Sequence, residues 1–182
     1  MPLLRILEYP DPVLKKRATP VPNLTGDVAT LVRSMSETMY AAPGIGLAAP
    51  QVGVSQRIIV LDVRGVDGAP GKGLLQLVNP EIVERDGEIV WEEGCLSVPD
   101  LTTPVKRAQR VLVRAWTPEE REIEVEADEL LAVALQHEID HLDGTLLVDR
   151  LSRLKRDLYR ARRRKLERQG KTGSSGKKPL LI

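Results

Sequence analysis

Five consecutive residues, His137-Glu138-Ile139-Asp140-His141, combine two imidazoles and a carboxylate at a spacing that suits metal binding. In a helix, residues four positions apart lie on one face, so both imidazoles can reach one ion. Glu138 would then flank the open side of the ion and exchange protons with water. The alternative is that both histidines are ordinary residues of a buried helix. Two imidazoles in an apolar core would need polar partners, which favours the metal site.

The third protein ligand of such a site has few candidates. The chain has only two histidines, so the third histidine of a metzincin-type site is absent. A downstream acid, as in thermolysin-like proteases, would have to be Asp149, Asp157 or Glu167. The single cysteine, Cys95, could be a small buried residue, but a thiolate is a strong ligand for iron or zinc. Beside two histidines that lack a third ligand, we predict that Cys95 binds the metal.

Three helices are expected around these residues. Residues 128–144 carry the histidines, are apolar on several faces and end at Gly144, so they predict a buried helix. Residues 27–41 have apolar side chains at helical spacing, and residues 151–170 suit an exposed, basic amphipathic helix.

The strand candidates precede the histidine helix. Residues 44–53 are expected to form a glycine-bounded loop, and Asp86-Gly87 is a favourable hairpin turn. The predicted strands are residues 57–63, 74–80, 81–91, 110–116 and 122–127. Strands first and helices at the ends predict an α+β fold, with antiparallel or mixed sheets packed around the buried His-Glu-x-x-His helix.

Composition fits a globular protein of 182 residues with 42% hydrophobic and 29% charged residues. One cysteine excludes an intramolecular disulfide. No apolar run approaches the roughly 20 residues of a membrane span, and Pro10 and Pro12 come too early for a signal peptide. We therefore expect a cytoplasmic protein without a membrane partner.

Charge is unevenly distributed along the chain. Residues 151–182 hold 12 lysines and arginines against two acids, a net charge of +10, which leaves −9 for the first 150 residues. We expect residues 1–150 to form the catalytic domain, residues 151–170 a basic helix and residues 171–182 a flexible tail. A basic segment on an acidic body suggests that this segment has an anionic partner.

Three segments together resemble the peptide deformylase family. They are GIGLAAPQVG (44–53), EGCLSVP (93–99) and QHEIDHLDG (136–144), in the order and at spacings typical of that family. The resemblance covers roughly residues 2–165. One departure is Asp100, where many relatives have glycine, and we expect only a changed loop there.

The resemblance implies a metallohydrolase that removes the formyl group from the N-terminal formylmethionine of nascent polypeptides and releases formate. It implies Fe²⁺ bound by Cys95, His137 and His141, with Zn²⁺, Ni²⁺ or Co²⁺ able to replace it. Glu138 would act as general base and acid. The Gln51 side-chain amide and the Leu96 backbone N–H would stabilise the oxyanion.

The resemblance also implies a substrate-binding surface along a strand edge near Gly46. Its candidate residues, several of which are equally well explained as turn or core residues, are Gly44, Ile45, Gly46, Glu93, Gly94, Leu130, Val133 and Ala134. Glu93 and Arg107 are expected to form a supporting ion pair.

The partner of the basic helix implied by the resemblance is the ribosome, near the nascent-chain exit. We expect a monomer. Two other functions remain open: a small zinc peptidase that uses the same helix, and a non-catalytic ribosome-associated protein with a structural metal. The second is disfavoured because structural sites fill all four positions with protein ligands.

Overall fold

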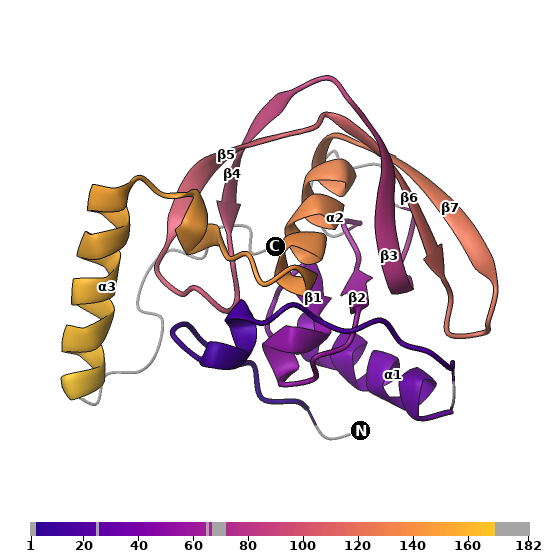
Figure 1. Cartoon of the computed structure of the whole chain (residues 1–182), viewed down its shortest axis with the longest axis horizontal. Helices are drawn as coiled ribbons and strands as arrows, with labels where there is room; N and C mark the ends of the chain where they lie inside the picture. The colour runs from indigo at the N-terminus through magenta and orange to yellow at the C-terminus, as the bar shows by residue number, and fades with distance from the viewer. Residues whose placement is uncertain (1–2, 25, 65, 67–71, 170–182) are drawn as a thin grey trace.

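The computed structural model describes residues 3–24, 26–64, 66 and 72–169. Figure 1 shows α2 (Glu129–Leu142) at the centre of the molecule, α1 (Gly26–Ala41) below it and α3 (Arg153–Arg168) standing at one end. The strands are β1 (Gly46–Ala48), β2 (Ile58–Leu61), β3 (Leu75–Asp86), β4 (Ile89–Gly94), β5 (Thr102–Arg107), β6 (Arg110–Trp116) and β7 (Glu122–Asp128). Short 3-10 helices are η1 (Pro12–Lys15), η2 (Ala49–Val52) and η3 (Leu147–Arg150).

The strands form two sheets whose ladders are all antiparallel. One sheet has five strands in the order β1-β2-β3-β6-β7, and the other consists of β4 and β5. The predicted α+β class, with a basic helix at the C-terminal end, is confirmed. None of the helices in the described part of the chain is long and apolar enough to cross a membrane.

The predicted hairpin between β3 and β4 is wrong. Gly87 makes a turn with a φ of 63°, but β3 pairs with β2 and β6, whereas β4 pairs with β5 from Ile89↔Arg107 to Gly94↔Thr102. Turn residues fix a local change of direction but do not choose the partner strand. The prediction also merged the β4 segment with the end of β3.

Residues 44–53, predicted as an irregular loop, contain β1 and η2. A strand of three residues is too short to show an alternating pattern, and β1 is defined by its pairing with β2, as in Gly46↔Leu61. Strand β5 was not predicted because Pro104 lies inside it. Proline is tolerated there because β5 pairs only with β4 among the described strands.

Helix α2 forms the centre of the core, as predicted. Twelve of its 14 residues are buried, and it packs against β1, β2 and β7. Gly144 follows the helix with a φ of 73°, and a Cβ there would lie 2.6 Å from the carbonyl oxygen of Lys15. Glycine therefore allows both the turn and the close approach of the N-terminal segment.

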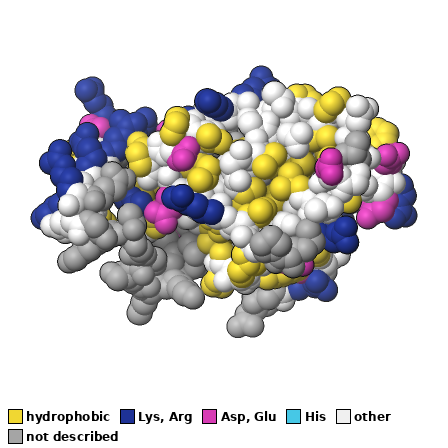
Figure 2. Space-filling view, turned by 90° about the horizontal axis from the view of Figure 1, so that it is seen from below, with side chains coloured by type: hydrophobic (Ala, Val, Ile, Leu, Met, Phe, Trp, Pro, Cys, Tyr) yellow, Lys and Arg dark blue, Asp and Glu magenta, His cyan; other side chains and the backbone are white. Residues whose placement is uncertain are grey.

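Helix α3 is attached by a few specific contacts. The Tyr159 hydroxyl donates to the Pro99 carbonyl at 2.9 Å, Arg160 Nε donates to the Tyr9 hydroxyl at 2.8 Å, and Arg163 pairs with Glu8 at 2.7 Å. Most other described side chains of α3 are exposed, and basic side chains gather at this end of the molecule in Figure 2. The predicted flexible tail, residues 171–182, lies outside the described residues.

Candidate metal centre

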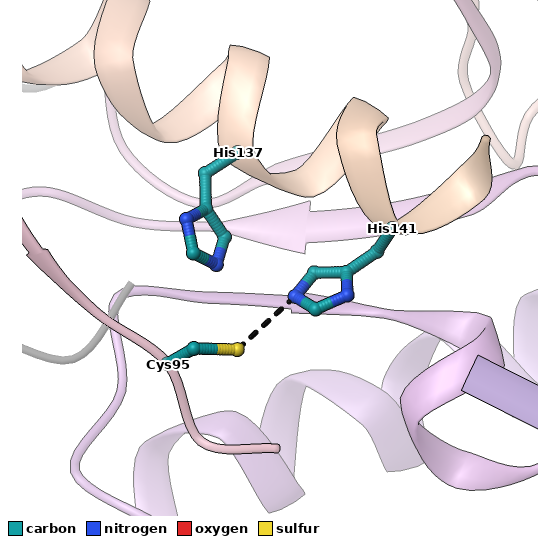
Figure 3. A group of neighbouring side chains, drawn as sticks. All are labelled: Cys95, His137 and His141. Carbon is teal, nitrogen blue, oxygen red and sulfur yellow. Dashed lines mark hydrogen bonds between the residues drawn. The ribbon is translucent and has the colours of Figure 1, made fainter. Parts of the chain in front are cut away.

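Cys95, His137 and His141 meet inside the molecule, although 42 positions separate the cysteine from the first histidine. One potential ligand atom from each lies within 4.8 Å of the other two. Cys95 Sγ is 3.2 Å from His141 Nε2, and the two imidazole centroids are 5.0 Å apart at 69°. Figure 3 shows both rings projecting from α2 toward the cysteine on the facing segment. All three side chains are buried.

Local structure explains this convergence. One turn of α2 places the two imidazoles on the same face. Cys95 follows directly after β4, and the turn that it begins is closed by Val98 N–H donating to its carbonyl at 3.1 Å. Cys95 and Val98 also belong to an apolar cluster that includes Leu14, so the sulfur is held by packing as well as by the turn.

The chemistry of these atoms fits a divalent cation. Buried polar side-chain atoms normally have hydrogen-bond partners, yet His137 Nε2 and both Glu138 carboxylate oxygens have none among the described residues. Burial lowers the pKa of His141, so this ring is neutral, as a metal ligand must be. One sulfur and two imidazole nitrogens form a donor set that suits iron or zinc.

The Cys95 thiol depends on such a cation for its charge. Burial raises the pKa of this thiol, and the neighbouring Glu138 and Glu93 charges raise it further. Without a cation, the sulfur would therefore stay protonated at neutral pH. A coordinating thiol is deprotonated by its metal, so the donor set and a divalent ion would stabilise each other.

A buried ionic network holds His137 at Nδ1, the ring nitrogen on the side away from Cys95. Its Nδ1 lies 2.8 Å from Glu93 Oε2, and Arg107 donates to both Glu93 oxygens at 2.7 and 2.9 Å. Burial raises the pKa of Glu93, but hydrogen bonds from Arg107 and His137 outweigh that effect and hold the pKa at about 2. An ionised Glu93 accepts a hydrogen bond from the Nδ1–H group of His137, which leaves the Nε2 lone pair facing Cys95 and His141.

The network extends toward the surface through Asp140. Arg107 Nη1 donates to Asp140 Oδ2 at 2.7 Å, and Arg150 Nη2 donates to the same oxygen at 2.6 Å. The predicted Glu93–Arg107 ion pair is therefore present, whereas the roles of Asp140 and Arg150 were missed. The spacing of Asp140 and Arg150 along the chain gives no signal for this contact.

Glu93 was predicted to bind substrate, but its oxygens already pair with Arg107 and His137, so we interpret it as a support for His137.

Gln51 lies beside Cys95 and is fully buried. Its Oε1 accepts from the Ala48 backbone N–H at 2.7 Å, and its Nε2 lies 3.1 Å from Ser97 Oγ and 3.9 Å from Cys95 Sγ. The side-chain amide therefore faces the predicted metal ligands. Ser97, which helps to orient it, was missed, although it lies within the quoted EGCLSVP segment.

The other predicted site residues surround this centre in two groups. Ile45, Leu130, Val133 and Ala134 are buried in one apolar cluster, so each has a packing role whether or not it contacts a substrate. Gly44, Gly46, Gly94 and Leu96 lie on the two segments that flank α2, at the start of β1 and the end of β4.

Asp100 has an unusual backbone conformation. Its φ is 60°, a left-handed conformation that glycine adopts without strain and that aspartate tolerates better than most residues.

Together, the fold and these contacts define an α+β protein whose buried His-Glu-x-x-His helix faces a cysteine on a neighbouring segment. The family model described as polypeptide deformylase matches residues 3–157 of the chain. The chain belongs to the polypeptide deformylase family, whose members are hydrolases that act on formylated nascent peptides.

Individual relatives agree with this assignment. The chain is 54% identical over 160 residues to a peptide deformylase of Thermodesulfovibrio yellowstonii, covering 88% of this chain and 96% of that protein. The crystal structure of a peptide deformylase from Legionella pneumophila has a TM-score of 0.85 at 44% identity, covering 94% of this chain and all of that one. The Ehrlichia chaffeensis enzyme in complex with actinonin has a TM-score of 0.87 at 38% identity, covering 92% and 99%.

Proposed function

We propose that this chain removes the formyl group from the N-terminal formylmethionine of nascent polypeptides, with one Fe²⁺ held by Cys95, His137 and His141. Family membership supports the reaction. The observation that carries the site assignment is the convergence of one sulfur and two imidazole nitrogens within 4.8 Å in a buried setting. A bound divalent ion supplies hydroxide at neutral pH, because it lowers the pKa of water from about 15.7 to about 7.

Glu138 is the proposed general base and acid. Burial, followed by the Glu93 charge, raises the pKa of Glu138 well above that of an ordinary carboxyl group. A carboxyl with a raised pKa can take a proton from the attacking water and return it to the departing amine. Its oxygens have no partners among the described residues, so they are free to do so.

Gln51 and the Leu96 backbone N–H are the proposed oxyanion donors. Gln51 is fixed through its Oε1, so its Nε2–H group is oriented before a substrate arrives. Such preorganised donors stabilise the charge that develops on the formyl oxygen, and loss of one costs about 2.7–4 kcal/mol of transition-state stabilisation.

The proposed substrate path follows β1, which is an edge strand of the larger sheet. An extended peptide can add to such an edge through backbone hydrogen bonds. Gly44, Gly46 and Gly94 would allow its close approach, and Ile45, Leu130, Val133 and Ala134 would line the methionine pocket. Because the substrate is a nascent chain, we place the activity in the cytoplasm.

The proposed division of the chain is a catalytic part, residues 1–150, followed by a basic helix and a tail. The exposed arginines of α3 have the charge pattern of a surface that binds RNA phosphates, which supports a docking role on the ribosome near the nascent-chain exit. We propose that the enzyme acts there as a monomer.

The test is an anaerobic assay of formate release from formyl-Met-Ala-Ser, with metal analysis on the same sample. We expect about one Fe²⁺ per chain and turnover that disappears when the ion is removed and returns when Fe²⁺ is restored. A casein digest tests the peptidase alternative in parallel. Casein cleavage without formate release would contradict the proposed function.

A further inference from the structure

Gly46 and Glu138 lie closer together than a side chain at position 46 would allow. A Cβ built at Gly46 would lie 2.8 Å from Glu138 Cδ and 3.0 Å from Cγ, and closer still to Oε1. Real Cβ atoms essentially never approach a neighbour within 3.0 Å. The carboxyl of Glu138 therefore occupies the space in which a side chain at position 46 would lie.

Backbone conformation does not require glycine at this position. The φ angle of Gly46 lies outside the left-handed region, unlike those of Gly53, Gly73, Gly87 and Gly144. An L-residue could adopt this extended backbone without strain. The need for glycine at position 46 is one of space, and the atoms that fill the space belong to Glu138.

The two backbones that carry this contact cannot move apart easily. The β1 backbone is held by pairing of Gly46 with Leu61, and the Asp62 N–H donates to the Ile45 carbonyl at 2.8 Å. Glu138 is fully buried on α2, between two other buried residues, His137 and Ile139. A methyl group at position 46 would therefore displace the carboxyl rather than either backbone.

Gly44, two residues earlier, differs in kind. A Cβ there would meet the Leu96 side chain, with Cδ1 at 2.7 Å and Cγ at 3.4 Å. The nearest atom is the end of a flexible, half-buried side chain, which can rotate. Of these two glycines, only Gly46 faces the proposed general base.

We propose that Gly46 is a positioning residue, whose missing side chain creates the space that holds the Glu138 carboxyl beside the strand edge where the substrate lies. The backbone of Gly46 would then lie beside the proposed substrate path, and its Cα lies beside the Glu138 carboxyl. The catalytic part of this inference rests on the proposed role of Glu138, whereas the steric part does not.

A double-mutant cycle on thermal unfolding tests the steric part. Gly46→Ala, Glu138→Ala and the double variant are compared with the wild type, all metal-loaded. We expect Gly46→Ala to lower the unfolding midpoint clearly in the wild-type background and to have little effect when residue 138 is alanine. Equal loss in both backgrounds would overturn the proposal, because the clash would then involve other atoms.

Gly26→Ala is the matched control for the cycle. Gly26 begins α1, and a Cβ there would meet nothing within 4 Å. The substitution Gly26→Ala introduces the same chemical change, so its effect on the unfolding midpoint should be equal in both backgrounds.

If Gly46→Ala fails to fold and the double variant folds, the proposal is supported. If neither folds, Glu138 is not the obstacle and the proposal fails.

Steady-state kinetics test the catalytic part. Metal-loaded Gly46→Ala should lose at least tenfold in kcat for formyl-Met-Ala-Ser, with metal content unchanged and a smaller change in KM. A wild-type kcat would contradict the positioning role. If the wild-type enzyme itself releases no formate, the proposed function fails, while the unfolding cycle still reports whether Gly46 and Glu138 compete for space.

Discussion

Helices α2 and α3 are both rich in ionisable residues, but the surroundings of those residues differ. In α2, 12 of 14 residues are buried: His137 lies against Glu93 and His141 against Cys95, and the half-buried Asp140 pairs with Arg107. In α3, most charged side chains whose exposure is described face solvent, and buried Tyr159 and Arg163 attach the helix to the body. The comparison teaches that burial brings ionisable groups together in the proposed metal site, whereas exposure leaves them available for the proposed docking surface.

The two helices are nevertheless connected through one apolar cluster. Tyr159 of α3 packs in the same cluster as Cys95, and its hydroxyl holds the Pro99 carbonyl four residues after the cysteine. Deletion of residues 151–182 would therefore disturb the packing behind Cys95 as well as remove charge. Substitutions confined to exposed residues separate these two effects.

The largest expected effect comes from the buried acid of α2. Glu138→Gln should reduce turnover by about 10²–10⁴-fold, because the amide cannot exchange the proton, while metal content stays the same. Formate release and metal analysis on one preparation measure both. Glu129→Gln, on the exposed first turn of α2, is the control and should leave turnover unchanged. Loss of metal from Glu138→Gln would instead make this residue structural.

The next largest effect is expected at Arg107. Arg107→Met leaves the Glu93 charge buried beside His137 without its main partner, and breaking a buried pair costs about 3–5 kcal/mol of unfolding free energy. Denaturant unfolding measures this cost. The neighbouring Lys106–Glu88 pair is exposed, so Lys106→Met should cost no more than about 1 kcal/mol. Similar losses of unfolding free energy in both variants would show that burial of the network does not increase its contribution to stability.

A smaller effect is expected at the junction of the two helices. Tyr159→Phe removes the hydroxyl that donates to Pro99 and should cost about 0.5–1.5 kcal/mol of unfolding free energy. Leu158→Ala, at an exposed position of the same helix, should change stability by less than about 0.5 kcal/mol. A larger loss from Leu158→Ala would mean that α3 packs through its exposed face.

The smallest effect on catalysis is expected from the outer face of α3. Replacing Arg162, Arg164 and Lys165 with glutamate should leave hydrolysis of short formyl-peptides unchanged but weaken ribosome binding. The logarithmic salt dependence of binding should become shallower by about 2 to 3. Three other exposed basic residues, changed in the same way, control for net charge: Lys16, Arg33 and Arg121. Equal weakening by both sets would remove α3 as a specific docking surface.

Sequence alone predicted the features that depend on a short local pattern or on a residue type that occurs only once. The His-Glu-x-x-His helix follows from a short pattern, and Cys95 was identifiable because the chain has one cysteine. Features that depend on tertiary contacts were missed, such as Ser97 against Gln51 and Arg150 against Asp140. The β3–β4 hairpin was predicted wrongly because a turn signal does not encode which strands pair over longer distances.

X-ray absorption spectroscopy of the zinc-loaded protein tests the central claim most directly. We predict one sulfur at about 2.3 Å and two imidazole nitrogens at about 2.0–2.1 Å from the ion, with the sulfur signal absent in Cys95→Ser. A zinc environment without sulfur, or a sulfur signal that persists in Cys95→Ser, would contradict the assignment of Cys95, His137 and His141 as the metal ligands.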